Sequence, residues 1–159
     1  MKNKNLSFMT QAAMIAAIYV VLTYIFAPFS FGEVQVRISE ALTIFTPAAI
    51  PGLFVGCLIG NILGGAILPD IVFGSIATLI GAFFTWKLRE QKPVVATFPP
   101  IISNIIIVPF VLRYGYGVTL PIPFMMLTVG IGEVISCTIL GLIVYGALKK
   151  YKSTLFRTA

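Results

Sequence analysis

The chain has 159 residues, of which 58% are hydrophobic and 10% are charged, and its formal net charge is +6. A soluble domain carries roughly 25% charged residues, so this composition excludes an ordinary soluble protein and predicts one all-α integral membrane domain covering residues 1–159. The sequence has no histidine and no Gly-x-x-x-x-Gly-Lys-Ser/Thr loop, which argues against His-based catalysis, a His-based zinc site and ATP binding, and we expect neither an enzyme nor a bound cofactor or metal.

Six apolar segments follow one another along the chain. A membrane-spanning helix needs about 17–25 mostly apolar residues, and the second segment is the only one shorter than that, because Pro47 and Pro51 bracket its end. We expect a bundle of six transmembrane helices, at roughly residues 8–27, 37–50, 51–68, 71–87, 94–112 and 124–148.

The first segment contains two interleaved Ala-x-x-x-Ala pairs. Ala12 pairs with Ala16, and Ala13 pairs with Ala17. Small residues four apart let two membrane helices approach closely, so this segment is a candidate docking helix. The spacing alone leaves open which of the two pairs would face a partner.

The second segment, V-Q-V-R-I-S-E-A-L-T-I-F, carries Arg37 and Glu40. Residues three apart share one face of a helix. The pair could be a local ion pair at the mouth of the membrane, with Arg37 reaching water along its apolar stem, or part of a binding site.

The third segment has glycine at positions 52, 56, 60 and 64. Each glycine in a helix costs about 1 kcal/mol relative to alanine. Four in register therefore predict a close approach, either within the bundle or to a docking partner. Asn61 lies beside them, where it could strengthen helix packing or present both a donor and an acceptor to a ligand.

Polar residues also mark the fourth and fifth segments. Asp70, a further candidate substrate-binding residue, lies in the outer turn before the fourth. Asn104 lies within the fifth with the same two interpretations as Asn61. Pro99, Pro100 and Pro109 also fall in the fifth segment, where we expect them to delay, kink or break the helix.

Glu133 lies about nine residues into the last segment, or roughly 13 Å deep at 1.5 Å per residue. A charge near the centre of the bilayer costs at least about 2.5–3.5 kcal/mol. Glu133 is therefore either protonated, paired internally, or a ligand-binding carboxylate. Cys57 and Cys137 lie in apolar runs, and we expect both to be packed as small hydrophobic residues without a disulfide.

Basic residues follow a topological pattern. With six crossings, three groups fall on one side of the membrane, namely Lys2 and Lys4, then Lys87, Arg89 and Lys92, and finally Lys149, Lys150, Lys152 and Arg157. The positive-inside rule then places both termini in the cytoplasm. The net charge therefore reflects membrane topology and not a nucleic-acid partner.

The opposite half of the chain is acidic. It holds four acids and two bases, which are Glu33, Glu40, Asp70 and Glu133, against Arg37 and Arg113. A cation, or a ligand with several N–H donors, would find acceptors there.

Two stretches, V-Q-V-R-I-S-E-A-L-T-I-F-T-P-A-A-I-P-G-L-F-V-G-C-L-I-G-N and D-I-V-F-G-S-I-A-T-L-I-G-A-F-F-T-W-K-L-R, resemble the QueT family. Members of that family are substrate-binding S components of energy-coupling factor (ECF) transporters in the bacterial cytoplasmic membrane. The resemblance covers nearly the whole chain. It implies a six-helix bundle of the S-component type, with both termini in the cytoplasm.

The resemblance implies uptake of a queuosine precursor, a 7-deazaguanine base or its aminomethyl form. It also implies a transmembrane T component and two cytoplasmic ATPases as partners, with docking through Ala12, Ala13, Ala16 and Ala17. Two adjacent donors of the base would suit a carboxylate, and the aminomethyl group, charged like lysine, would suit a second one. Glu40 and Glu133 are the candidates, and Arg37 would orient Glu40.

Three other functions remain open. An S component for another nutrient or vitamin would share the fold and the partners, although an anionic vitamin would prefer a basic chamber. A stand-alone proton-coupled carrier would use Glu133 as a proton relay and need no ATPase. A membrane enzyme would have to work without histidine.

Overall fold

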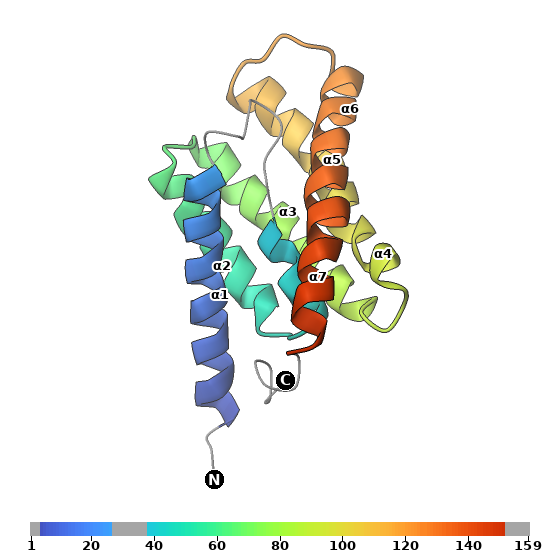
Figure 1. Cartoon of the computed structure of the whole chain (residues 1–159). Coiled ribbons are helices and arrows are strands. Elements are labelled where there is room, and N and C mark those ends of the chain that lie inside the picture. Colours follow the sequence, from blue (N-terminus) through green and yellow to red (C-terminus); the bar gives the residue numbers. More distant parts are fainter. Residues whose placement is uncertain (1–3, 27–37, 152–159) are drawn as a thin grey trace.

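The computed structural model describes residues 4–26 and 38–151, and every regular element within them is helical. Arg37 lies outside these residues. In chain order the elements (Figure 1) are α1 (Lys4–Phe26), the 3-10 helix η2 (Ile38–Ile44), α2 (Ala49–Leu63), α3 (Leu68–Lys87), α4 (Pro93–Ala96), α5 (Phe98–Phe110), the π-helix η3 (Val111–Gly115), α6 (Ile122–Glu133), the π-helix η4 (Val134–Leu140) and α7 (Gly141–Lys149).

Four helical stretches are long and apolar enough to cross a membrane. They are α1, α3, the run α4–α5–η3 (Pro93–Gly115) and the run α6–η4–α7 (Ile122–Lys149). Helix α2 is apolar but shorter, with 15 residues. These lengths confirm the expected all-helical, multi-pass membrane character of the chain.

The second expected span takes a different form. It contains η2, which has seven residues and reaches about 14 Å at roughly 2.0 Å per residue, well short of the ~30 Å hydrocarbon core. Pro47 accounts for the early end, because the residue before a proline avoids the helical conformation. That residue is Thr46, whose Oγ1 accepts a hydrogen bond from the Ala48 N–H at 3.2 Å. Six spanning helices are therefore not found within residues 4–26 and 38–151.

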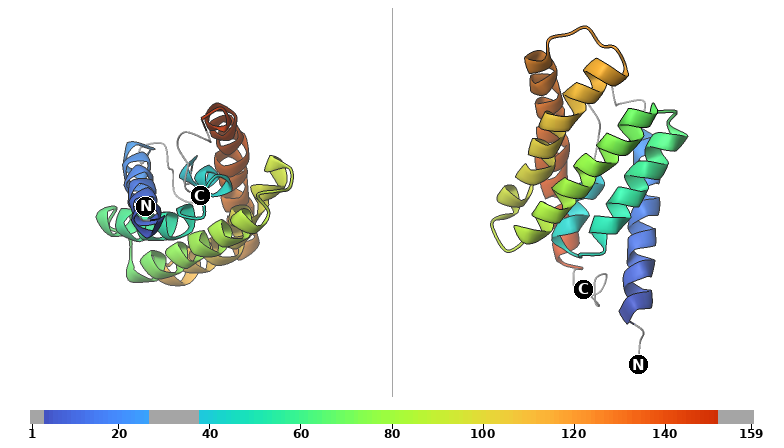
Figure 2. Two further views of the ribbon diagram at one scale, coloured as in Figure 1. Left: turned by 90° about the horizontal axis from the view of Figure 1, so that it is seen from below. Right: turned by 180° about the vertical axis from the view of Figure 1, so that it is seen from behind.

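The short η2 lies inside the bundle. It contacts α1, α2, α3, η4 and α7, and the end-on view shows the longer helices around it (Figure 2). Helix α1 begins and α7 ends at one end of the molecule, while the turn between α2 and α3 lies at the other (Figure 1). A non-spanning segment is tolerated at membrane depth when protein surrounds it, and η2 meets that condition.

The glycine row of α2 packs against α1. A Cβ atom added to Gly52 would lie 2.7 Å from the carbonyl oxygen of Ala12, and one added to Gly56 would lie 2.7 Å from Tyr19 Cβ and 3.0 Å from the oxygen of Ala16. Real Cβ atoms do not come this close, so only glycine allows this approach. The row therefore serves packing within the bundle.

This packing separates the two alanine pairs of α1. Ala16 is buried and Ala12 is partly buried against α2, whereas Ala13 and Ala17 are exposed. Ala12 and Ala16 thus pack against α2 within the chain. Ala13 and Ala17 form a face of small residues on the outside of the bundle.

Helices α3 and α5 approach each other at a second glycine. A Cβ at Gly81 would lie 2.7 Å from Pro100 Cα. The expected effect of the prolines is found here, since α4 ends at Ala96 and α5 begins only at Phe98. Side chains satisfy carbonyls at this break: Thr85 Oγ1 donates to the Ala96 oxygen at 3.0 Å, as expected where membrane helices are interrupted.

Candidate substrate-binding site

Two buried carboxylates meet in the middle of the bundle. Glu40 comes from η2 and Glu133 is the last residue of α6, and both are at least nine-tenths buried. Between them lies Cys137 of η4, whose Sγ is 3.4 Å from Glu40 Oε2 and 3.2 Å from Glu133 Oε2. The ligating atoms of the three residues all lie within 4.8 Å of one another.

Local sequence explains this convergence. Glu133, Cys137 and Gly141 recur every four residues, which places them along one face of the last helix. The space left by Gly141 is filled by η2, because a Cβ added there would lie 3.6 Å from Ala41 Cβ. The π-helical turns of η4 begin directly after Glu133, and such turns are frequent at functional sites.

The electrostatics of the cluster call for a positive or hydrogen-bonding counterpart. Two carboxylates in an interior of low dielectric repel each other when both are ionised. The Cys137 thiol has one proton to donate, and Glu40 and Glu133 also take part in interactions with other groups. A shared proton, a cationic side chain or a ligand rich in N–H donors would stabilise the pair.

A small cavity lies beside the cluster. Its volume is about 10 Å³, and its polar lining comes from Glu40, Thr85, Thr97 and Cys137. Such a volume holds about one water molecule. Thr97 is further tied to Thr138, with the two hydroxyl oxygens 3.0 Å apart. In this conformation the acids are therefore enclosed and the cavity is smaller than a bicyclic base.

Asn61 and Asp70 meet at the turn between α2 and α3. Asn61 Nδ2 donates to the backbone oxygen of Asp70 at 3.3 Å, and Asp70 Oδ2 accepts a hydrogen bond from Tyr116 Oη at 2.8 Å. Partial burial, and then the hydrogen bond and negative charge of Asp70, raise the pKa of the Tyr116 hydroxyl above its ordinary value. These contacts join the outer turns to each other.

Asn104 is fully buried on α5 and bonds to the backbone one turn earlier in the same helix. Its Nδ2 donates to the Pro100 oxygen at 3.0 Å, as does Ser103 Oγ. Within the described part of the chain, Asn104 Oδ1 has no hydrogen-bond partner. The structure thus gives Asn104 a packing role and leaves its role toward a ligand a prediction.

Sequence reasoning selected Glu40 and Glu133 but missed Cys137 as their neighbour. Cys137 was expected to be a packed hydrophobic residue, and it is indeed buried and free. Its position four residues after a membrane glutamate was the signal that could have identified it.

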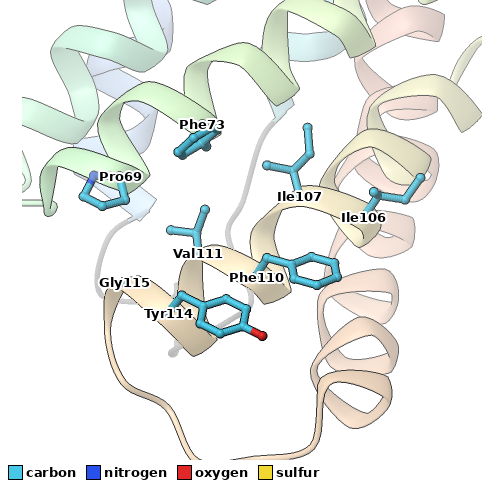
Figure 3. Close-up of a pocket in the computed structure, with 8 residues that line it drawn as sticks. All are labelled: Pro69, Phe73, Ile106, Ile107, Phe110, Val111, Tyr114 and Gly115. Atoms are coloured by element: carbon cyan, nitrogen blue, oxygen red, sulfur yellow. The ribbon is translucent and has the colours of Figure 1, made fainter.

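Two cavities larger than the one beside the acids are apolar and lie elsewhere. One of about 490 Å³ lies between α3 and the α5–η3 run, with Phe73, Phe110 and Tyr114 in its wall (Figure 3). Among the residues that the structure describes, no charged side chain lines it. A base with several hydrogen-bonding groups would leave them unsatisfied there, so this cavity does not suit such a ligand.

A family model described as QueT transporter matches residues 9–150 of the chain. The match runs from the first turns of α1 to the end of α7 and confirms the family expected from the two quoted stretches. No curated protein and no solved structure matches the chain.

Proposed function

The chain belongs to the QueT transporter family, and from that premise we propose that it is the substrate-binding S component of a bacterial ECF transporter. Its substrate would be a queuosine precursor such as 7-aminomethyl-7-deazaguanine. It would act as a transport subunit in the cytoplasmic membrane with both termini inside, as the basic residues indicate.

The meeting of Glu40 and Glu133 carries this proposal. A guanine-like edge offers two adjacent N–H donors, which a carboxylate accepts side by side. The aminomethyl group is a cation at neutral pH by analogy with lysine and suits a second carboxylate. Two buried acids with ligating atoms within 4.8 Å of one thiol are a fitting counterpart to a ligand with both features.

Binding would require the site to open. The cavity beside the acids has room for about one water molecule, whereas ligand-binding cavities usually measure about 300–1,000 Å³. Separation of η2 from η4 and α7 would create that room, because η2 carries Glu40 and packs against the helix that carries Glu133 and Cys137.

Energy would come from partner subunits. The sequence has no phosphate-binding loop, so ATP hydrolysis would fall to two cytoplasmic ATPases, coupled through a transmembrane T component. For docking on that component we favour Ala13 and Ala17, because they are exposed while Ala12 and Ala16 face α2.

Calorimetric titration of the detergent-purified chain with 7-aminomethyl-7-deazaguanine tests the acid pair. Glu133→Gln and Glu40→Gln keep the side-chain shape but turn one acceptor into a donor that would face the donors of the ligand. Losing a charged hydrogen bond and leaving a buried group unsatisfied costs about 2–4 kcal/mol, which is roughly 30- to 1000-fold in Kd. Glu90→Gln is the matched control, because this exposed carboxylate pairs with Arg89 instead. Unchanged affinity in both site variants would remove the acids from the substrate site.

A stand-alone proton-coupled carrier is the second candidate. The observation in its favour is the buried thiol between two carboxylates, since intramembrane acids often relay protons. Proteoliposomes separate the two functions. Accumulation of substrate by this chain alone, driven by a pH gradient, would favour the carrier, whereas uptake only with the T component and ATPases would favour the S component.

A further inference from the structure

A long apolar groove runs along the outside of the bundle between α3 and α5. It consists of the cavity shown in Figure 3 and a second cavity of about 430 Å³ closer to the end of α3. Ile106 and Ile107 line both cavities, so the two form one continuous surface. None of the described residues that line the two cavities is charged.

The walls of the groove are open to the outside. Ile102, Ile106 and Phe110 lie four residues apart on one face of α5 and are about half exposed, and Phe84 of α3 is 48% exposed on the facing wall. From Pro99 to Gly115 the groove extends about 24 Å at 1.5 Å per residue, close to the thickness of the hydrocarbon core. This length and this lining suit extended acyl chains.

Positive charge is concentrated at one end of the groove. Leu88 lines that end, between Lys87 and Arg89, and Lys92 follows in the turn to α4. The Arg89 guanidinium is occupied, because it stacks on Trp86 and donates to the Trp86 oxygen and the Glu90 carboxylate. The remaining cations at the mouth are the exposed Lys92 and the exposed Lys87, whose ammonium lies 4.9 Å from the centre of the Phe83 ring.

We infer that this groove binds an anionic phospholipid. The acyl chains lie along the α3–α5 surface, and Lys87 and Lys92 hold the phosphate. Basic side chains beside membrane helices attract anionic headgroups, and Lys87, Arg89 and Lys92 cluster at the end where a headgroup would sit. Near the other end, the Arg113 guanidinium donates to the Val118 backbone oxygen. The Ser103 hydroxyl in the groove donates to the Pro100 oxygen within its own helix, and Tyr114 at the far end is 78% exposed. The rest of the described lining offers acyl chains an apolar surface.

Native mass spectrometry of the full chain, released from nanodiscs of phosphatidylcholine with added phosphatidylglycerol, tests this inference. Wild type should retain phosphatidylglycerol in preference to phosphatidylcholine. The double variant Lys87→Gln/Lys92→Gln should bind it about 30-fold more weakly, since each lysine contributes roughly fivefold. The control Lys4→Gln/Lys149→Gln removes the same charge at the start of α1 and the end of α7, and it should bind like wild type.

A second variant tests the acyl-chain surface. Ile106→Trp fills the junction of the two cavities from a half-exposed position, so the fold should persist while retention of phosphatidylglycerol falls. Unchanged retention in both variants, or equal retention of both lipids by wild type, would overturn the inference. A loss of T-component binding or of dimers in Ile106→Trp with unchanged lipid retention would assign the groove to a protein partner instead.

Discussion

Two tryptophan substitutions three residues apart on α1 should impair different properties. Ala16→Trp should lower the stability of the fold, and Ala13→Trp should weaken binding of the T component. Ala16 is 8% exposed and faces α2, where a Cβ added to Gly56 would already lie 3.1 Å from Ala16 Cα. No indole fits between backbones this close. Ala13, by contrast, is exposed, so Ala13→Trp adds its ring on the outside of the bundle.

The magnitude follows from overpacking. Inserting extra atoms into a well-packed contact costs typically 1–3 kcal/mol, and an indole at Ala16 lies at the upper end of that range. For a chain of this size each kcal/mol lowers Tm by about 2–4 °C, so Ala16→Trp should lower Tm by roughly 6–12 °C. Ala13→Trp should leave Tm within about 2 °C of wild type but reduce co-purification with the T component.

Thermal unfolding in detergent, followed by pull-down on the T component, measures both effects. Gly56→Ala is an independent variant, because its Cβ would meet Tyr19 Cβ at 2.7 Å and should also lower Tm. A wild-type Tm for Ala16→Trp would refute the packing of α1 on the glycine row. An equal loss of Tm for Ala13→Trp would show that this face is already occupied in the folded chain.

Three further predictions concern other contacts. Gly81→Ala should lower the free energy of unfolding by about 1–3 kcal/mol, and with it Tm in thermal unfolding, because its Cβ would lie 2.7 Å from Pro100 Cα. A variant as stable as wild type would contradict the close approach of α3 and α5. Asn104→Leu removes the hydrogen bond from Nδ2 to the Pro100 oxygen, which Ser103 Oγ still bonds, and it also removes the buried Oδ1, which has no partner among the described residues. These two changes offset each other, so Tm should stay nearly unchanged in thermal unfolding, while reduced substrate affinity in calorimetry would assign Asn104 to the site. The pKa of the Tyr116 hydroxyl is raised in the folded state. Its hydrogen bond to Asp70 therefore stabilises the fold below about pH 10, and this stabilisation is lost as pH rises through the higher pKa of the folded state. Tyr116→Phe should abolish that alkaline loss of stability in a pH series of unfolding curves.

Apolar length made most of the fold predictable from the sequence. The first expected span, residues 8–27, corresponds to Lys4–Phe26, and the last, residues 124–148, lies within Ile122–Lys149. Such spans are specified locally, because each must satisfy its own backbone hydrogen bonds in lipid. The segment at residues 37–50 was not predictable in this way, since η2 depends on the helices that surround it.

The site was predictable in part. The cost of burying a charge identified Glu133 as a candidate, and the resemblance identified Glu40. That the two meet depends on the path of the chain, because 97 residues separate Glu40 from the bridging Cys137. Asn61 and Asp70 were chosen for their polarity, and the structure shows them bonded to each other, with their contact to a substrate still a prediction.

The shortness of η2 determines the order in which the chain can be assembled during synthesis. Seven residues with a glutamate among them are too short and too polar to be released into lipid as an independent span. We therefore expect them to enter together with α2. The turn between η2 and α2 contacts α1, because Thr46 Oγ1 donates a hydrogen bond to Gln11 Oε1 at 3.0 Å. Glu40 can contact Glu133 and Cys137 only after the final helical run, which carries both residues, has been synthesised. The nascent protein thus acquires its acid pair only in the last step of its biogenesis, and a chain that stops before α6 leaves a carboxylate in the membrane without the neighbours of its finished fold.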